Sequence, residues 1–290
     1  MGVHAGFEER DSGRRLDRHP DRLPLLTSQS FGSTRTNLWT VVGIGLVAYP
    51  ACDMVHEVLG HGLACLLTGV RALSLSTVAL QTGTSNRFVA AAGSIANVVA
   101  GLLAMWLFRR GKTFGAARYF LWLFAGLNLL NGTGYLLFSG VLDFGDWALV
   151  IAGLEPHWAW RLVMAAAGAV LYVGAIKLIA ASAIPLVRGG AMDRREMPRL
   201  VFPAYVAGGL LLVAAPALNR VSLSLVLTSG VSSGFGAMAG LVRVPSLIER
   251  RTKESVSMAA PLQFNLGWII AGFMVAVAFV AVLGPGVRLP

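Results

Sequence analysis

Two histidines and two carboxylates lie within nine residues of an otherwise apolar segment. The sequence DMVHEVLGHG begins at Asp53 and holds His56, Glu57 and His61. Neutral imidazole is a good zinc ligand, and a neighbouring carboxylate can act as the general base that activates a water molecule. These residue types indicate a metal-dependent hydrolytic site, with His56 and His61 as ligands and Glu57 as the base.

The spacing of the two histidines sets a condition on the helix that carries them. In the familiar His-Glu-x-x-His motif the histidines are four residues apart and share one face. His56 and His61 are five apart (61 − 56 = 5), which leaves their rings about 140° apart around a regular α-helix. Both reach one ion only if the helix widens by one residue, as a π-bulge does, and Gly60 eases that distortion. In a regular helix, Glu57 and His61 are four apart and form the alternative ligand pair.

The segments around this motif are apolar enough to cross a membrane. The 290-residue chain is 56 % hydrophobic and 13 % charged, with a mean hydropathy of +0.68, whereas soluble domains carry about 25 % charged residues. A helical span needs about 20 apolar residues. Besides residues 38–69, runs of about that length occupy 88–108, 119–142, 162–187, 200–218, 221–242 and 262–287. The sequence therefore predicts an all-α polytopic membrane protein with six or seven transmembrane helices.

Several segments depart from a plain series of spans. Residues 1–36 are polar and of mixed charge, which predicts a disordered tail. Segment 38–69 is too long for one straight span at about 1.5 Å per residue, so we expect a kink at Pro50 or a break near Gly60 and Gly62. Residues 70–82 alternate leucine with serine between flanking glycines, which predicts a short membrane-associated β-hairpin or an edge strand. The run at 221–242 is rich in Ser and Gly and could be re-entrant, or could form a tight hairpin with 200–218.

The net charge of +10 is concentrated in the breaks between apolar runs. Basic residues gather in alternate breaks, which is the positive-inside pattern and places the N-terminus and these loops in the cytoplasm. Anionic lipid of the bilayer is the expected neighbour of this charge, and no nucleic-acid module is evident. We expect an integral protein of a bacterial plasma membrane. The three basic clusters are Arg109, Arg110, Lys112 and Arg118; Arg188, Arg194, Arg195 and Arg199; and Arg243, Arg250, Arg251 and Lys253.

Three segments, in order, resemble the core of the site-2 proteases, a family of intramembrane zinc metalloproteases. The first is HEVLGHGLACLLTGVR at 56–71. The second, AAGSIANVV at 91–99, is close to the family's Ala-Gly-Pro-x-Ala-Asn pattern, with Ser94 in the proline position. The third, NLLNGTGYLLFSGVLDFGDW at 128–147, is similar to the family's later Asn-rich helix that ends in an aspartate ligand.

The resemblance implies a metalloprotease core at 37–150 and additional transmembrane helices at 151–290. It also implies that zinc is held by His56, His61 and an aspartate, that Glu57 activates water, and that the substrate is a membrane-anchored protein. The predicted hairpin at 70–82 falls where the family carries one.

The resemblance leaves two candidates for the third ligand. We favour Asp146, because Gly-Asp-Trp is compact and the tryptophan can fix the aspartate at the membrane interface, and Asp143 is the alternative. Asn97 and Asn128 are expected to bind the substrate backbone or to steady the helices through interhelical hydrogen bonds.

The charge pattern supplies a check on the depth of these ligands. With the N-terminus inside, His56 lies 18 residues (56 − 38 = 18) into the first span, toward its outer end. The run at 119–142 ends on that same side, next to both aspartates. Glu155 and His157 fall in the same outer loop and could be a loop anchor, a spare ligand or a gate.

Two other functions are open to the sequence. A family member without protease activity would serve as a membrane scaffold or binding protein, which the five-residue spacing would suit. A transporter or channel would use Asp53, His56, Glu57 and His61 as an ion path, because ionisable side chains within a span are costly and often mark such paths. Bound metal without hydrolysis would identify the scaffold, and solute flux without tight zinc binding would identify the transporter or channel.

Overall fold

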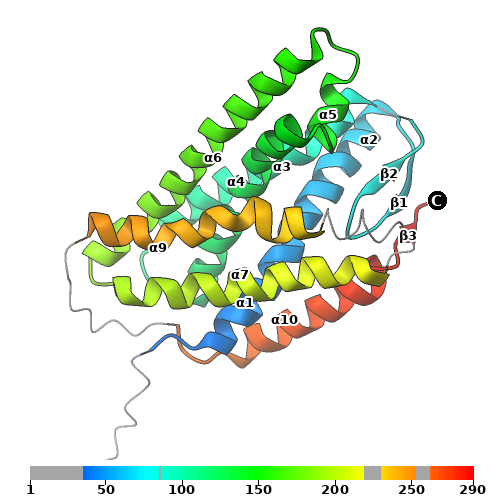
Figure 1. Ribbon diagram of the computed structural model, residues 1–290. Coiled ribbons are helices and arrows are strands. Elements are labelled where there is room, and N and C mark those ends of the chain that lie inside the picture. Colours follow the sequence, from blue (N-terminus) through cyan, green and yellow to red (C-terminus); the bar gives the residue numbers. More distant parts are fainter. Residues whose placement is uncertain (1–34, 85, 219–229, 253–261) are drawn as a thin grey trace, which may run out of the picture. The chain divides into compact units, whose positions relative to one another are not determined.

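Six helices are long and apolar enough to cross a membrane in the part of the chain that the structure describes. The structure, a computed structural model, describes residues 35–84, 86–218, 230–252 and 262–290, and 79 % of these described residues are helical (Figure 1). This confirms the helical class. The number of candidate helices, six, agrees with the lower of the two expected numbers of transmembrane helices. The six candidate spans are Leu38–Thr68, α3 (Arg87–Arg110), α4 (Ala116–Leu142), α6 (His157–Arg188), Arg194–Leu218 and Leu266–Leu283.

The first of these candidate spans, Leu38–Thr68, is called the first span below, and it is one helix with a widened turn inside it. Asn37 caps its start, because the Asn37 side chain accepts a hydrogen bond from the Thr40 N–H at 3.0 Å. α1 (Leu38–Met54) continues through a π-helix (Val55–Gly62) into α2 (Leu63–Thr68), and Pro50 lies inside α1 without ending it. The expected break near Gly60 and Gly62 is therefore wrong, because i→i+5 hydrogen bonds carry the backbone through this stretch.

A small antiparallel sheet follows the first span. β1 (Ala72–Leu75) pairs with β2 (Leu80–Thr82), which confirms a hairpin at 70–82. β3 (Val287–Arg288) pairs with the other edge of β1, so the strand order is β2-β1-β3. The sequence did not indicate this third strand, because two residues carry no readable alternation.

The remaining helices pack against the first span or against α4. α1 contacts α7 (Met197–Ala214) and α10 (Leu266–Ala278), while α4 contacts α3 and α6. The helices of 151–290 thus pack directly on those of the predicted core. Residues 1–34 of the predicted tail lie outside the described residues.

The apolar run at 221–242 is not a span within the described residues. Its first part, to residue 229, lies outside them. The rest contains two short irregular turns, Ser232–Gly236 and Ala237–Ala239, followed by α9 (Gly240–Arg251). The expectation that Arg243, Arg250 and Arg251 occupy a loop is wrong, because α9 carries them on its exposed side. The buried side of α9 has helical spacing and consists of Gly240, Leu241, Val244 and Ile248.

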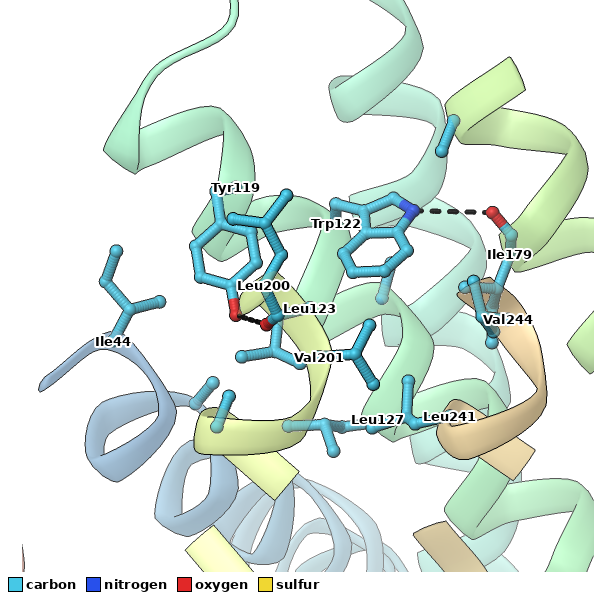
Figure 2. Packing of buried hydrophobic residues seen from close by; sticks show 14 of the residues in the cluster. Ile44, Tyr119, Trp122, Leu123, Leu127, Ile179, Leu200, Val201, Leu241 and Val244 are labelled. Carbon is cyan, nitrogen blue, oxygen red and sulfur yellow. Dashed lines mark hydrogen bonds between the residues drawn. The ribbon is translucent and has the colours of Figure 1, made fainter. Parts of the chain in front are cut away.

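Two aromatic residues of α4 form hydrogen bonds to α7 and α6 within the core (Figure 2). The Tyr119 hydroxyl donates a hydrogen bond to the backbone carbonyl of Leu200 in α7. The Trp122 indole N–H donates to the carbonyl of Ile179 in α6 at 3.3 Å. Both rings are buried, so α4 makes directional as well as apolar contacts to two of its neighbours.

Glycines let the backbones of α4 and α6 approach closely. A Cβ at Gly140 would lie 2.6 Å from the Ala165 nitrogen, and one at Gly168 would overlap the Leu137 backbone. α4 also contributes Asn128 to the site described below, so this packing fixes a helix that the site needs.

We expect Gly168→Val to destabilise the packing of α4 against α6. The added side chain must displace the Leu137 backbone, and overpacking of this kind costs about 1–3 kcal/mol. The control is Gly174→Val on the same helix, where an added Cβ meets nothing within 4 Å. Equilibrium unfolding of both variants in mixed micelles with increasing dodecyl sulfate measures the difference. Equal unfolding midpoints would contradict the prediction.

Candidate metal centre

The widened turn brings His56 and His61 onto one face of the first span. The π-helix runs over Val55–Gly62, and its i→i+5 hydrogen bonds bring residues five apart close to register. The two rings meet edge to face, with centroids 4.8 Å apart. The structure thus contains the one-residue expansion that the spacing requires.

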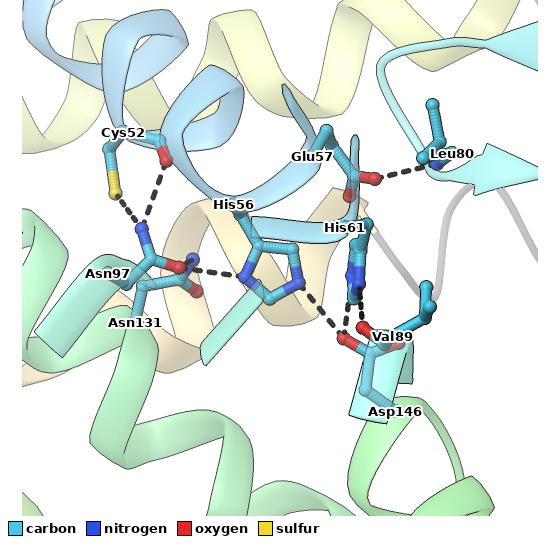
Figure 3. Close-up of polar contacts among 9 residues, drawn as sticks. All are labelled: Cys52, His56, Glu57, His61, Leu80, Val89, Asn97, Asn131 and Asp146. Atoms are coloured by element: carbon cyan, nitrogen blue, oxygen red, sulfur yellow. Dashed lines mark hydrogen bonds and ion pairs between the residues drawn. The ribbon is translucent and has the colours of Figure 1, made fainter. Parts of the chain in front are cut away.

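Asp146 completes a group of three ligand atoms. It is the first residue of α5 (Asp146–Ile151), directly after Gly145, whose φ of 85° turns the chain back toward the first span. Asp146 Oδ2 lies 2.9 Å from His56 Nε2 and 3.2 Å from His61 Nε2 (Figure 3). Nitrogen and carboxylate oxygen within 4.8 Å of one another form a donor set that suits zinc.

Hydrogen bonds on the far side of each ring decide which nitrogen is free. His61 Nδ1–H donates to the Val89 carbonyl at 2.7 Å, and a carbonyl can only accept. His56 Nδ1–H donates to Asn97 Oδ1, also at 2.7 Å. In the neutral rings the Nε2 lone pairs therefore point at the Asp146 carboxylate. Three acceptors that face one another repel unless a cation or a proton lies between them. Hydrogen bonds from Nδ1, such as the two described here, are also those that orient metal-ligating histidines.

The charge of Asp146 also favours a cation. Burial raises the pKa of the Asp146 carboxyl, but His56 and His61, when protonated, outweigh burial through their hydrogen bonds and positive charge, so beside the charged rings this pKa lies below its ordinary value. The ionised carboxylate is thus favoured where positive charge lies beside it, and the ionised form is the one that binds a metal ion.

Asn97 and Asn128 support this group from inside the helix bundle. Both are fully buried. The Asn97 amide nitrogen donates to the Cys52 carbonyl at 3.1 Å and to Asn128 Oδ1 at 2.8 Å. Asn131, which the sequence analysis did not single out, donates to Asn97 Oδ1 at 3.2 Å. Neither Asn97 nor Asn128 lines the cavity beside the ligands, so both join helices, and Asn97 orients His56.

Glu57 faces a cavity of about 440 Å³ beside the ligands. The backbone N–H of Leu80, at the start of β2, donates to Glu57 Oε2 at 2.6 Å. His61 and Asp146 line the same cavity, as do Tyr135 and residues of β2 and the turn after it. Glu57 is not part of the three-ligand group, so the alternative of Glu57 and His61 as the ligand pair does not describe this structure.

Asp143 belongs to a different cluster. Its carboxylate lies 3.0 Å from His157 Nε2 and 3.7 Å from an Arg161 guanidinium nitrogen. The Glu155 carboxylate accepts a hydrogen bond from the His157 backbone N–H at 3.3 Å. Asp143, Glu155 and His157 thus anchor the loop between α4 and α6, and Asp146 is the aspartate that meets the histidines.

Besides Asn131, two residues at the site had no role predicted from the sequence. A Cβ at Gly93 of α3 would lie 2.6 Å from His56 Nε2 and 2.7 Å from His61 Nε2, so only glycine leaves room for both rings. The Tyr135 ring lies 5.2 Å from that of His56. Tyr135 is seven residues after Asn128, and this helical spacing is the signal that could have found it.

We expect zinc to bind with about one ion per chain and to be lost in His56→Ala, His61→Ala and Asp146→Ala. Each change removes one of the three ligand atoms. Asp143→Ala should keep its zinc, because His157 and Arg161 hold that carboxylate. Metal analysis of protein purified in detergent without chelators measures this, with circular dichroism as a check on helicity. Zinc lost in Asp143→Ala and kept in Asp146→Ala would reverse the assignment.

Gly93→Ala should lower the zinc affinity at least about tenfold, because the new methyl group displaces both ligand rings. The matched control is Gly62→Ala in the widened turn itself, where the nearest atom to an added Cβ is the Glu57 carbonyl oxygen at 3.5 Å. Competition with a fluorescent zinc chelator gives both affinities. An unchanged affinity in Gly93→Ala would show that the site does not depend on this close approach.

The chain was compared with protein-family models, with curated proteins and with solved structures, and none of them matches it. The resemblance to site-2 proteases therefore rests on the three sequence segments alone, and the site is interpreted from its own residues and their geometry.

Proposed function

We propose that this protein is an intramembrane zinc metalloprotease that hydrolyses peptide bonds of membrane-anchored proteins. The observation that carries the proposal is the meeting of His56, His61 and Asp146, from two distant segments, beside a cavity that Glu57 lines. A pure scaffold has no need for a carboxylate beside three ligand atoms.

The residues at the cavity divide the chemistry of hydrolysis between them. His56, His61 and Asp146 would hold the ion. Zinc, when bound, polarises water and the scissile carbonyl and stabilises the negative charge that forms on the carbonyl oxygen. Glu57 accepts the proton of the attacking water and passes it to the leaving amine. The Leu80 N–H holds one Glu57 oxygen at 2.6 Å, which leaves the second oxygen for this proton.

The helix that carries the histidines supports a substrate within or beside the membrane. The site lies in the candidate span Leu38–Thr68. Next to the histidines, Leu59, Leu66 and Leu67 expose apolar side chains to the outside of the helix bundle, as expected of a surface that faces lipid. A helical substrate must unwind locally there, because the peptide bonds of a helix are enclosed by its own side chains and hydrogen bonds.

Glu57→Gln should keep its zinc and lose about 10²–10⁴-fold of the hydrolysis rate, because glutamine cannot accept the proton. Zinc-loaded protein in liposomes is assayed against a library of membrane-anchored peptides, and products are identified by mass spectrometry. Glu155→Gln is the matched control, since Glu155 lies in the anchor loop outside the cavity.

Three results would overturn the proposal. Cleavage by Glu57→Gln at the rate of the unaltered protein would show that Glu57 is not the base. One zinc per chain without any cleavage by the unaltered protein would favour a scaffold. Solute flux through liposomes without tight zinc would favour a transporter.

A further inference from the structure

A second cavity, of about 360 Å³, adjoins the metal centre. Its walls come from the second half of α4, the loop before α5, α6 and the two irregular turns at Ser232–Ala239. The residues that matter for the argument are Tyr135, Phe138, Phe144, Tyr172, Gly236 and Ala237.

Two aromatic residues form a partition between the cavities. Tyr135 and Phe144 line both of them. The Tyr135 ring lies 5.2 Å from the His56 ring on one side and 5.9 Å from the Phe138 ring on the other. Phe138 in turn meets Phe144 edge to face at 6.2 Å. The second cavity therefore begins one aromatic side chain away from a metal ligand.

The lining of the second cavity selects an apolar occupant. Among the residues that the structure describes, this lining contains no Asp, Glu, Lys, Arg or His. The Tyr172 hydroxyl is already used, since it donates to the Ala237 carbonyl and accepts from the Gly240 N–H, both at 2.8 Å. A charged group would lose its hydration here without meeting a group of opposite charge in the described lining, whereas an apolar side chain would lie against Phe, Leu, Ala and Gly.

We propose that this cavity binds a large apolar side chain of the substrate, on a residue that flanks the scissile bond. The inference rests on the proposed function. In an extended peptide, neighbouring residues are about 3.3 Å apart and their side chains point to opposite faces. A peptide with its carbonyl beside Glu57 and the three ligands thus directs one flanking side chain toward Tyr135 and Phe144. The cavity volume falls within the range of about 300–1,000 Å³ usual for ligand pockets.

Gly236 offers a way to fill the cavity without disturbing the fold. Its backbone is right-handed helical, with a φ of −62°, and an added Cβ would have its nearest contact, the Val231 carbonyl oxygen, at 3.8 Å. Gly236→Leu therefore occupies the space that the substrate side chain needs. Gly174→Leu is the control, because Gly174 is exposed on α6, away from the cavity, with nothing within 4 Å of an added Cβ.

The test measures kcat/KM for membrane-anchored peptides that carry Leu, Phe or Ala at each position flanking the cleaved bond. The unaltered protein should prefer Leu or Phe over Ala at one flanking position by at least about tenfold. Gly236→Leu should abolish that preference by lowering kcat/KM for the Leu and Phe peptides toward that for the Ala peptide, and it should keep its zinc. Gly174→Leu should behave as the unaltered protein. A preference that survives in Gly236→Leu, or no preference in the unaltered protein, overturns the inference.

A second measurement separates this inference from the proposed function. If no peptide is cleaved, the proposed protease function is wrong, and peptide binding then tests the role of the cavity separately. Zinc-loaded Glu57→Gln is mixed with a membrane-anchored peptide that carries a benzophenone side chain at a flanking position, and the crosslinks formed on illumination are mapped by mass spectrometry. Crosslinks to Phe138 or Ala237 that disappear in Gly236→Leu support the subsite. Crosslinks confined to the outer surface of the helices, or to bound lipid, overturn it.

Discussion

The widened turn at Val55–Gly62 is the feature on which the rest of the site depends. A helix with an extra residue in one turn loses some of its regular packing, and it persists only where a neighbour compensates. Here the neighbour is α3, because a Cβ on Gly60 would overlap the backbone of Gly93. The same close approach brings Gly93 against both histidine rings. The irregular turn, the contact between two glycines and the orientation of the ligands therefore meet at Gly93 and form one arrangement.

Buried polar groups join this arrangement to the helix bundle. An amide inside an apolar bundle is costly unless its donors and acceptors find partners. Asn97 meets this requirement by bonding the first span at His56 and Cys52 and α4 at Asn128 and Asn131. The hydrogen bonds that hold α3 between two other helices also hold His56 in its ligand orientation. The stability of the bundle and the order of the candidate metal centre are consequently coupled.

The small sheet helps to position Glu57, although it contains few residues. β2 supplies the backbone N–H that holds Glu57, and β1 links β2 to β3 at the far end of the chain. The later helices contribute as well, since α6 and the turns at Ser232–Ala239 complete the apolar cavity next to the ligands. The residues after 150 thus do more than cover the core, because they shape the space where we place a substrate side chain.

The sequence by itself determined the helical class, the hairpin at 70–82 and the set of His56, Glu57 and His61, together with the condition that their helix must widen. These features can be read locally, because apolar runs, alternation and residue spacing depend only on near neighbours along the chain. Only the tertiary structure decided which of Asp143 and Asp146 lies beside the two histidines. Both follow the same span, and the choice depends on the turn at Gly145 and on the ion pairs of Asp143 with His157 and Arg161.

The third strand, the irregular turns at Ser232–Ala239 and the space that Gly93 leaves for two rings were likewise decided in three dimensions. Each depends on which distant segment packs against a residue, and a pattern of near neighbours does not record that partner.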